Sequence, residues 1–232
     1  MARTSAVRKP AKPDEAAAAP PRARGPRKLS EASLQARAER AAKTREELMA
    51  AAARLVGEVG YRDASIQRIT AACGVAAGTF YLYFPSRQAL FDELLPHFGL
   101  QMLDYVRRRI GQEERFFEAE ELGFKAVYEY LSDNPWFWRV LNEAEVEAPA
   151  AWARHHEAVH DRYIKFLRRA KARGELKHYS ASELATLADL LIAARDYVYR
   201  THLTVAGPSG GSIPKSVVQT YRRFIESGLA NG

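Results

Sequence analysis

Residues 65–90 read SIQRITAACGVAAGTFYLYFPSRQAL, and this stretch predicts two short helices joined by a tight turn. Ser65 and Ser86 carry the short hydroxyl side chains that cap helix starts, and Gly74 tolerates the positive φ that the turn requires. Four apolar residues lie where they can pack the two helices together: Ile66, Ile69, Val75 and Phe80. Two short helices joined in this way form a helix-turn-helix.

The second of these helices, expected near residues 76–84, has a composition suited to a close approach to DNA. Its first residues, 76–79, are small, so the backbone can come near a groove. Tyr81, Tyr83 and Arg87 can donate hydrogen bonds to phosphates. Both tyrosines could instead pack beneath the helix as core residues.

The stretch closely resembles the DNA-binding domain of the TetR family of bacterial transcriptional regulators. The resemblance covers residues 44–91 and includes Leu55, Gly60 and Tyr61 of the preceding helix, but not the C-terminal two-thirds of the chain. Where the family usually has alanine, a capping serine and lysine, this chain has Cys73, Ala76 and Arg87. The missing cap could cost the second helix about 0.5–2 kcal/mol.

The resemblance implies an all-α homodimer that represses transcription. Each subunit would place one helix in the major groove of a palindromic double-stranded operator, and a small molecule in the C-terminal domain would weaken DNA binding. At matching positions, the residues expected to face bases or nearby backbone are Ser65, Gln67, Ala77, Gly78, Thr79 and Tyr83. Those expected to hold phosphates are Thr44, Arg68, Tyr81 and Arg87.

The net charge of +7 on the 232 residues is concentrated at the N-terminus. Residues 1–45 contain 12 Lys and Arg against 4 Asp and Glu, whereas residues 46–232 contain 23 against 24. Residues 1–40 are also rich in proline and poor in large apolar side chains, which predicts a disordered basic arm whose last stretch, 31–40, could be helical. Such an arm either contacts a polyanion or only aids solubility.

Helical patterns divide the rest of the chain into a DNA-binding domain at 41–91 and an effector-binding and dimerisation domain at 92–232. Thr44 and Glu47 have the spacing of a capping box, which predicts a helix start. Gly60 is expected to stop that helix, and Pro96 to kink or end a later one. Further helices are expected near residues 113–132, 135–147, 150–173, 181–204 and 213–229.

Aromatic residues are frequent in the C-terminal region, and most of them are expected to form a helical core. Three successive rings at 136–138 cannot all face one side of a helix, so at least one should line a cavity, a subunit contact or solvent. We expect an apolar, aromatic or acyl effector. The residues assigned to its site are Phe124, Tyr128, Trp136, Trp138, Arg139, Trp152 and Tyr197.

Two apolar stripes near the C-terminus predict a dimer interface made of two helices from each subunit. The residues assigned to it are Leu184, Leu187, Leu191, Val198, Val217, Tyr221 and Phe224. The alternative is that both stripes pack only within their own subunit.

Residues 156–160 read HEAVH, which matches the HExxH pattern of zinc peptidases. His156 and His160 could share a zinc ion and Glu157 could act as a base, but the charged surroundings predict a solvent-facing segment rather than a catalytic cleft. The single Cys73 excludes an intrachain disulfide and is expected to pack as a small apolar residue rather than act as a redox sensor. We therefore expect no catalytic residue, no metal and no cofactor.

Length and hydropathy are consistent with this hypothesis. No apolar run reaches the ~18–20 residues of a membrane-spanning helix, and the N-terminus lacks the apolar core of a secretory signal. We therefore expect a cytoplasmic protein with no membrane partner. The alternatives are a zinc metallopeptidase and a basic-tailed helical interaction protein without sequence-specific DNA binding.

Overall fold

The computed structural model describes residues 30–204 and 213–229, and within these ranges every regular element is an α-helix. Residues 1–40 and 41–232 are separate compact units, and each is described by itself. Most of the predicted basic arm, residues 1–29, lies outside the described residues. The helices are α1 (Glu31–Asp63), α2 (Ile66–Ala72), α3 (Ala77–Phe80), α4 (Arg87–Ile110), α5 (Phe116–Asp133), α6 (Pro135–Glu147), α7 (Pro149–Ala172), α8 (Glu183–Thr204) and α9 (Lys215–Leu229).

Helix α1 begins earlier than the capping-box prediction placed it. Ser30 caps the helix, because its Oγ accepts a hydrogen bond from the N–H of Ser33 at 3.3 Å. The helix then continues through Thr44 without interruption, so the predicted start at Thr44 and Glu47 is wrong. Residues 44–47, TREE, match the capping-box pattern. Inside a helix, however, the backbone N–H groups that a cap would bind already donate to carbonyl oxygens of the preceding turn.

Gly60 breaks α1 as expected, with φ of 84° and ψ of 167°, and the chain completes one more turn after it. The kink contacts Arg139 and Glu143, which form an ion pair with each other on α6. The N–H of Tyr61 donates to Glu143 at 3.0 Å, and Arg139 donates to the carbonyl oxygen of Glu58 at 3.0 Å. A side chain at residue 60 would collide with both partners, so this junction also needs glycine for space.

The predicted helices of the C-terminal region are confirmed to within three residues at each end. Helix α4 runs through Pro96 to Ile110, so the proline does not end it. No helix in the described residues is long and apolar enough to cross a membrane.

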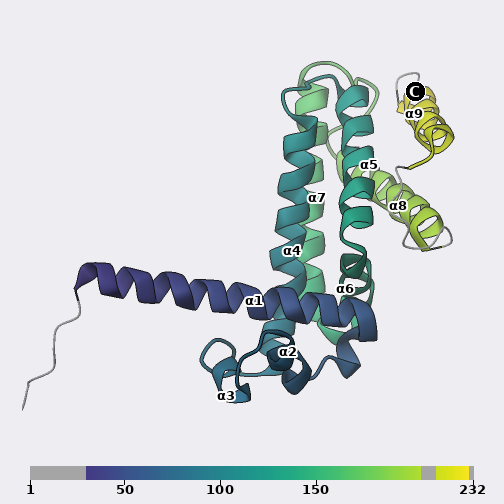
Figure 1. Cartoon of the computed structure of the whole chain (residues 1–232). Coiled ribbons are helices and arrows are strands. Elements are labelled where there is room, and N and C mark those ends of the chain that lie inside the picture. The colour runs from purple at the N-terminus through teal and green to yellow at the C-terminus, as the bar shows by residue number, and fades with distance from the viewer. Residues whose placement is uncertain (1–29, 205–212, 230–232) are drawn as a thin grey trace, which may run out of the picture. The chain divides into compact units, whose positions relative to one another are not determined.

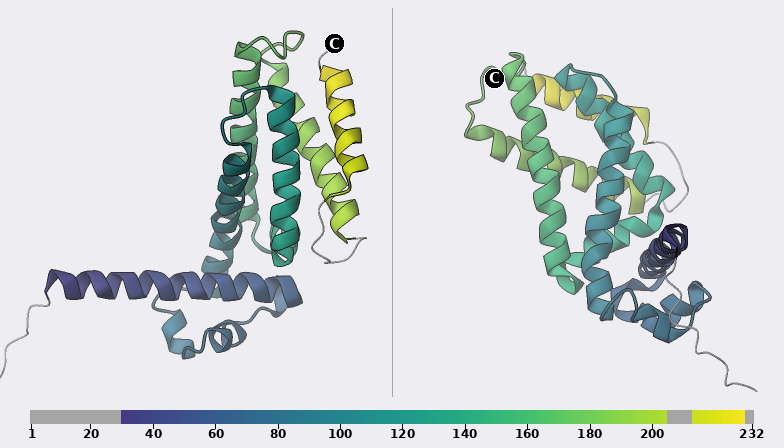
Figure 2. Two further views of the ribbon diagram at one scale, coloured as in Figure 1. Left: turned by 45° about the horizontal axis from the view of Figure 1, so that its top comes forward. Right: turned by 90° about the vertical axis from the view of Figure 1, so that its left-hand side faces the viewer.

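Within residues 41–232, the long helices α4, α5 and α7 run side by side, and α6 extends the line of α5 (Figure 1). Helices α8 and α9 lie against this group, α8 on α7 and α5, and α9 on α5 (Figure 2). A continuous core joins the helix-turn-helix to the bundle through Tyr61, which is fully buried and meets Phe91 of α4 at 4.9 Å between ring centroids.

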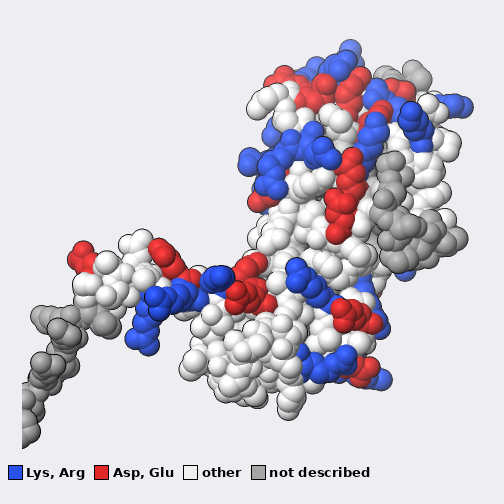
Figure 3. Space-filling model, viewed as in Figure 1, with Lys and Arg blue, Asp and Glu red and all other residues white. Residues whose placement is uncertain are grey.

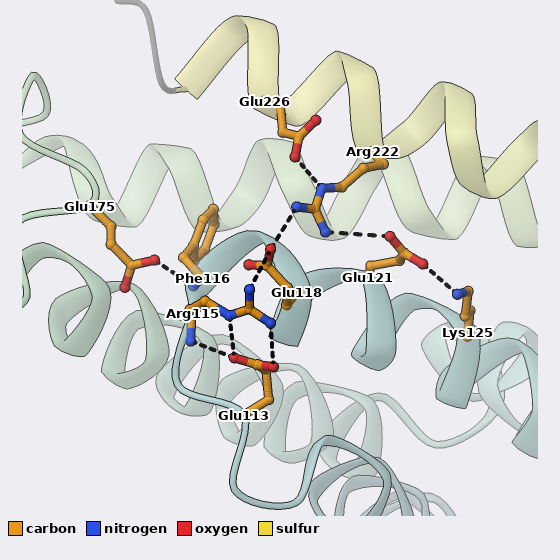
Figure 4. A network of polar contacts seen from close by, with 9 residues as sticks. All are labelled: Glu113, Arg115, Phe116, Glu118, Glu121, Lys125, Glu175, Arg222 and Glu226. Carbon is orange, nitrogen blue, oxygen red and sulfur yellow. Dashed lines mark hydrogen bonds and ion pairs between the residues drawn. The ribbon is translucent and has the colours of Figure 1, made fainter.

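Ion pairs fasten α9 to α5 (Figure 4). Arg222 of α9 contacts Glu118 at 3.1 Å and Glu121 at 3.4 Å on α5, and Glu226 on its own helix at 2.5 Å. At the start of α5, Glu175 accepts the N–H of Phe116 at 2.5 Å. Arg222 therefore adds ion pairs to the contact that the apolar face of α9 makes with α5.

Candidate DNA-binding and ligand-binding sites

The turn between α2 and α3 has the hydrogen bonds of a Schellman motif. The N–H of Val75 donates to Thr70 at 3.0 Å and that of Gly74 to Ala71 at 3.1 Å, and Gly74 has a φ of 67°. These bonds satisfy carbonyls at the end of α2 and direct the chain into α3. The helix-turn-helix geometry predicted at residues 65–84 is present.

Packing explains which face of α3 is outward. Phe80 is fully buried and touches Phe84, with ring centroids 5.7 Å apart. Its neighbour Tyr81 is 59% exposed. Tyr83 is half-buried and packs against the core, so its side chain serves partly in folding. A Cβ added at Gly78 would meet nothing within 4 Å, so packing within the chain does not require glycine there.

Four of the six expected base-facing residues keep exposed surface, whereas Ser65 and Tyr83 make contacts within the chain. Gln67, Ala77 and Gly78 are exposed and Thr79 is half-buried. Ser65 is occupied as the cap of α2, where its Oγ accepts the N–H of Arg68 at 3.3 Å. Leu82, which the sequence analysis did not select, is 79% exposed between the two tyrosines. Its position between two residues expected to contact DNA is the signal that could have identified it.

The expected phosphate-binding arginines are held by backbone groups. Arg68 donates to the carbonyl of Asp63 at 3.1 Å, and Arg87 donates to that of Arg62 at 3.0 Å. Neither forms an ion pair with a carboxylate among the described residues, so no acidic side chain competes with a phosphate for either guanidinium. Thr44 lies on α1, half-buried.

A cavity of about 900 Å³ lies among helices α4 to α8. Among the residues assigned to an effector site, only Trp138 lines it. Phe124 and Tyr128 are buried in the core, and Tyr197 is 72% exposed on α8. The assignment of these three to the cavity is therefore corrected.

The other assigned aromatic and basic residues also have structural contacts elsewhere. Trp136 packs edge-on against Phe98 at 4.9 Å, and Trp152 lies over the ring of His156 at 3.9 Å. Arg139 holds the α1 kink described above. Aromatic residues can cover a core or line a cavity equally well, so composition alone did not distinguish the two.

The wall of this cavity contains a buried polar cluster that sequence reasoning missed. The carboxylate of Glu120 on α5, 1% exposed, accepts hydrogen bonds from the hydroxyls of Tyr163 at 2.5 Å and Tyr221 at 2.6 Å. It also pairs with the guanidinium of Arg195 on α8 at 2.5 Å. Burial, countered by Arg195, raises the pKa of Tyr163 well above its ordinary value, so this phenol remains a donor.

The position of this cluster could have been found from helical spacing. Glu120 lies four residues after the buried Phe116 and four before the buried Phe124. Arg195 lies four residues after the buried Leu191. A charged residue that stands four positions from buried apolar residues on a helix faces the core and needs a buried partner. The apolar residues alone do not reveal such a pair.

The HExxH segment does not form a metal site. His156 bonds to the carbonyl of Trp152 at 3.0 Å and His160 pairs with Asp189 at 3.2 Å, so the two imidazoles have separate partners. No group of three metal-ligating side chains occurs in the described part of the chain. The segment was predicted to face solvent, but its neighbour His155 is buried against Gly99 and lines the cavity.

Burial, with His156 nearby, lowers the pKa of His155 from 6.5 to about 4. Unfolding therefore takes up a proton between these values. The free energy of unfolding should fall as pH drops from about 6.5 to about 4, by up to about 3 kcal/mol from this group. Urea unfolding of wild type and His155→Gln across this range would measure it, with the exposed His156→Gln as the control. Equal pH dependence in wild type and His155→Gln would contradict the assignment.

Cys73 is half-buried rather than fully buried, and its thiol donates to the carbonyl oxygen of Glu47 at 3.4 Å. Burial, together with Glu47, raises the pKa of this thiol. A raised thiol pKa disfavours the thiolate and agrees with a packing role.

The expected dimer residues divide into two groups. Leu184, Leu187, Leu191 and Tyr221 are buried within the chain, which corrects their assignment as residues presented to a partner. Phe224 is 64% exposed and, with Val198 and Val217, lines a groove of about 460 Å³ on α8 and α9. Leu190 and Tyr197 add exposed apolar surface on α8.

A helix-turn-helix followed by a helical bundle that encloses a cavity defines a class of DNA-binding regulators. Residues 48–94 match the family of bacterial regulatory proteins called the tetR family. This match lies within the helix-turn-helix region and agrees with the resemblance seen in the sequence.

Curated relatives match the same region. The chain is 36% identical over 77 residues to an uncharacterized HTH-type transcriptional regulator, YvdT, of Bacillus subtilis, a match covering 33% of this chain and 40% of the relative. It is 26% identical over 87 residues to the nucleoid occlusion factor SlmA of Glaesserella parasuis, covering 38% and 43%. The chain thus spans about two-fifths of these relatives' lengths. The matched family consists of regulatory proteins, which agrees with the prediction of a regulator rather than an enzyme.

Solved structures share the fold over most of the chain. The fatty acid degradation regulator FadR of Bacillus halodurans superposes with a TM-score of 0.67 and 17% identity, covering 80% of this chain and 96% of the other. FadR of Bacillus subtilis, solved in complex with stearoyl-CoA, gives a TM-score of 0.67 at 16% identity, covering 79% and 98%. The all-α architecture predicted from the sequence is confirmed.

Proposed function

We propose that this protein is a cytoplasmic, ligand-responsive repressor that binds a palindromic operator as a homodimer and is released by an apolar small molecule. One observation carries the proposal: the chain joins a helix-turn-helix with an outward recognition surface to a bundle with a cavity of about 900 Å³. That volume lies within the range of ligand pockets. The stearoyl-CoA complex of the Bacillus subtilis FadR, which has the same fold, supports an effector with an apolar chain.

The groove on α8 and α9 supports the dimer. Phe224 lines the groove and is exposed, and Leu190 and Tyr197 are further exposed apolar residues on α8. A pair of such faces related by two-fold symmetry would bury this apolar surface and place two recognition helices on one DNA molecule.

Selection of bound sequences from a random DNA pool tests the proposal. The expected result is an enriched inverted repeat whose half-sites are about one helical turn, roughly 34–36 Å, apart or a multiple of it. A pool without any enriched motif would contradict sequence-specific binding and favour a helical interaction protein. A single unrepeated half-site would contradict the dimer.

The basic arm should contribute affinity but little specificity. On the face shown in Figure 3, the surface over α2 and α3 carries few charged side chains, whereas residues 1–45 hold 12 of the chain's Lys and Arg. Each phosphate neutralised adds about −0.9 to the slope of log K against log salt. Deleting residues 1–40 should therefore flatten the slope by several units in a dimer.

Salt titrations of operator and random DNA with the full chain and the truncated chain would measure both slopes. The preference for the operator over random DNA should barely change, because a segment of this composition presents no fixed pattern of donors to base edges. Identical slopes would show that the arm does not contact DNA. A lost operator preference would show that it reads sequence or groove shape.

A further inference from the structure

Arg195 lies in the cavity wall, and only two of the three nitrogens of its guanidinium form hydrogen bonds within the described residues. Its Nη2 pairs with the Glu120 carboxylate at 2.5 Å and donates to the Glu120 carbonyl oxygen at 3.2 Å. Its Nε donates to the hydroxyl of Tyr221 at 3.2 Å. The face of the guanidinium lies over the ring of Tyr163, 5.1 Å from its centroid. These contacts hold the group rigidly.

The remaining nitrogen, Nη1, has no hydrogen-bond acceptor among the described residues. Every fully buried side-chain nitrogen or oxygen in the same part of the chain does have a partner. Nη1 must therefore have accessible surface, and the surface that Arg195 lines is the cavity. An oriented, positively charged N–H donor in a concave and largely apolar site is the kind of group that fixes a ligand's polar atom.

The charge next to this donor limits what it can bind. Glu120 already balances Arg195, and the Glu120 carboxylate is 1% exposed, where screening by water is weak. A second anion at Nη1 would lie within a few ångströms of that carboxylate and be repelled by it. An uncharged oxygen acceptor gains the hydrogen bond without this repulsion.

Apolar side chains form much of the remaining lining, namely Met102, Leu103, Val106, Val127, Leu131 and Ile192. Charged side chains also line the cavity, among them Arg107, Arg162 and Arg169. Helices α4, α5 and α8 supply the apolar side chains, and α5 and α8 also supply Glu120 and Arg195, so one ligand can reach both.

We propose that the effector is an uncharged carbonyl compound with an apolar chain, such as a ketone, ester or thioester, whose carbonyl oxygen accepts a hydrogen bond from Nη1 of Arg195. This assignment rests on the proposed effector role of the cavity and names the ligand class it takes. Glu120 acts as the selectivity residue, because its charge excludes free carboxylates from the same position.

Two probes of matched chain length test the proposal, methyl dodecanoate and dodecanoate at a pH where the latter is ionised. Trp138 lines the cavity, so quenching of its fluorescence reports binding, and Trp138→Phe assigns the signal. The wild type should bind the ester roughly 10- to 100-fold more tightly than the carboxylate, the range expected when a hydrogen bond to a charged donor is made in one case and opposed in the other. An absent ester signal, or equal affinity for the two probes, would overturn the proposal.

Two variants separate the roles of the paired residues. Glu120→Gln keeps the oxygen acceptor for the tyrosines but removes the negative charge, so dodecanoate affinity should rise about tenfold or more while ester affinity is retained. The double variant Glu120→Gln/Arg195→Met removes both charges together and should lose the ester preference. Unchanged ester binding in the double variant would exclude Arg195, and unchanged carboxylate binding in Glu120→Gln would exclude Glu120.

Thermal melts of each variant confirm that it is folded before titration. The titrations contain no DNA, so their result does not depend on whether the protein binds an operator. A selected inverted repeat together with absent ester binding would leave the repressor proposal standing and reject only this ligand class.

Discussion

Phe80→Ala should lower the free energy of unfolding by roughly 3–5 kcal/mol, the cost typical of deleting a core aromatic ring. Phe80 is fully buried and packs against Phe84, and it lies where α3 meets the rest of the helix-turn-helix. Removing the ring leaves a cavity that a four-residue helix cannot collapse to fill. Chemical denaturation of the wild type and the variant would measure the change.

Tyr81→Ala is the matched control, because Tyr81 directly follows Phe80 as the C-cap residue of α3. Tyr81 is 59% exposed, so its loss should leave the melting temperature nearly unchanged. Operator binding should weaken by about 1–3 kcal/mol in this variant. If the exposed tyrosine proved to be the stabilising residue and the buried phenylalanine the DNA contact, the orientation of α3 described above would be wrong.

Arg195→Met should be about as destabilising, by roughly 3–5 kcal/mol, since it leaves the charge of Glu120 buried without its cation. The Glu120 carboxylate would keep its bonds from Tyr163 and Tyr221 but lose the ion pair at 2.5 Å. Urea unfolding near neutral pH would measure the loss.

The double variant Glu120→Gln/Arg195→Met should recover most of that stability, because no uncompensated charge remains. This recovery distinguishes an orphaned charge from simple loss of packing by the arginine stem. A double variant as unstable as Arg195→Met alone would show that the ion pair is not what the single substitution disrupts.

Local signals in the sequence were sufficient to predict the helix-turn-helix. Ser65 and Ser86 cap their helices and Gly74 adopts a positive φ, each as its side chain predisposes it to do. The C-terminal helices follow from 3.6-residue periodicity in the same way. The error at α1 arose because two stretches carry capping chemistry, and Ser30 rather than Thr44 is the one used.

The sites in the C-terminal domain depended on contacts that no local pattern encodes. Which aromatic residues form core and which line the cavity is decided by neighbours far away in the chain, so Trp138 alone remained at the cavity. Leu184, Leu187 and Leu191 could equally have faced a second subunit, and packing within the chain covers them instead.

By itself, the sequence determined the all-α class, the helix-turn-helix and its register, and the concentration of positive charge at the N-terminus, because capping, periodicity and charge act over a few residues. Tertiary structure alone decided that Glu120 and Arg195, 75 positions apart, share a buried ion pair, and that His155 is buried beside Gly99. Burial and pairing between distant residues arise only when the helices pack, and they control both the charge of the cavity and the chemistry of its ligand.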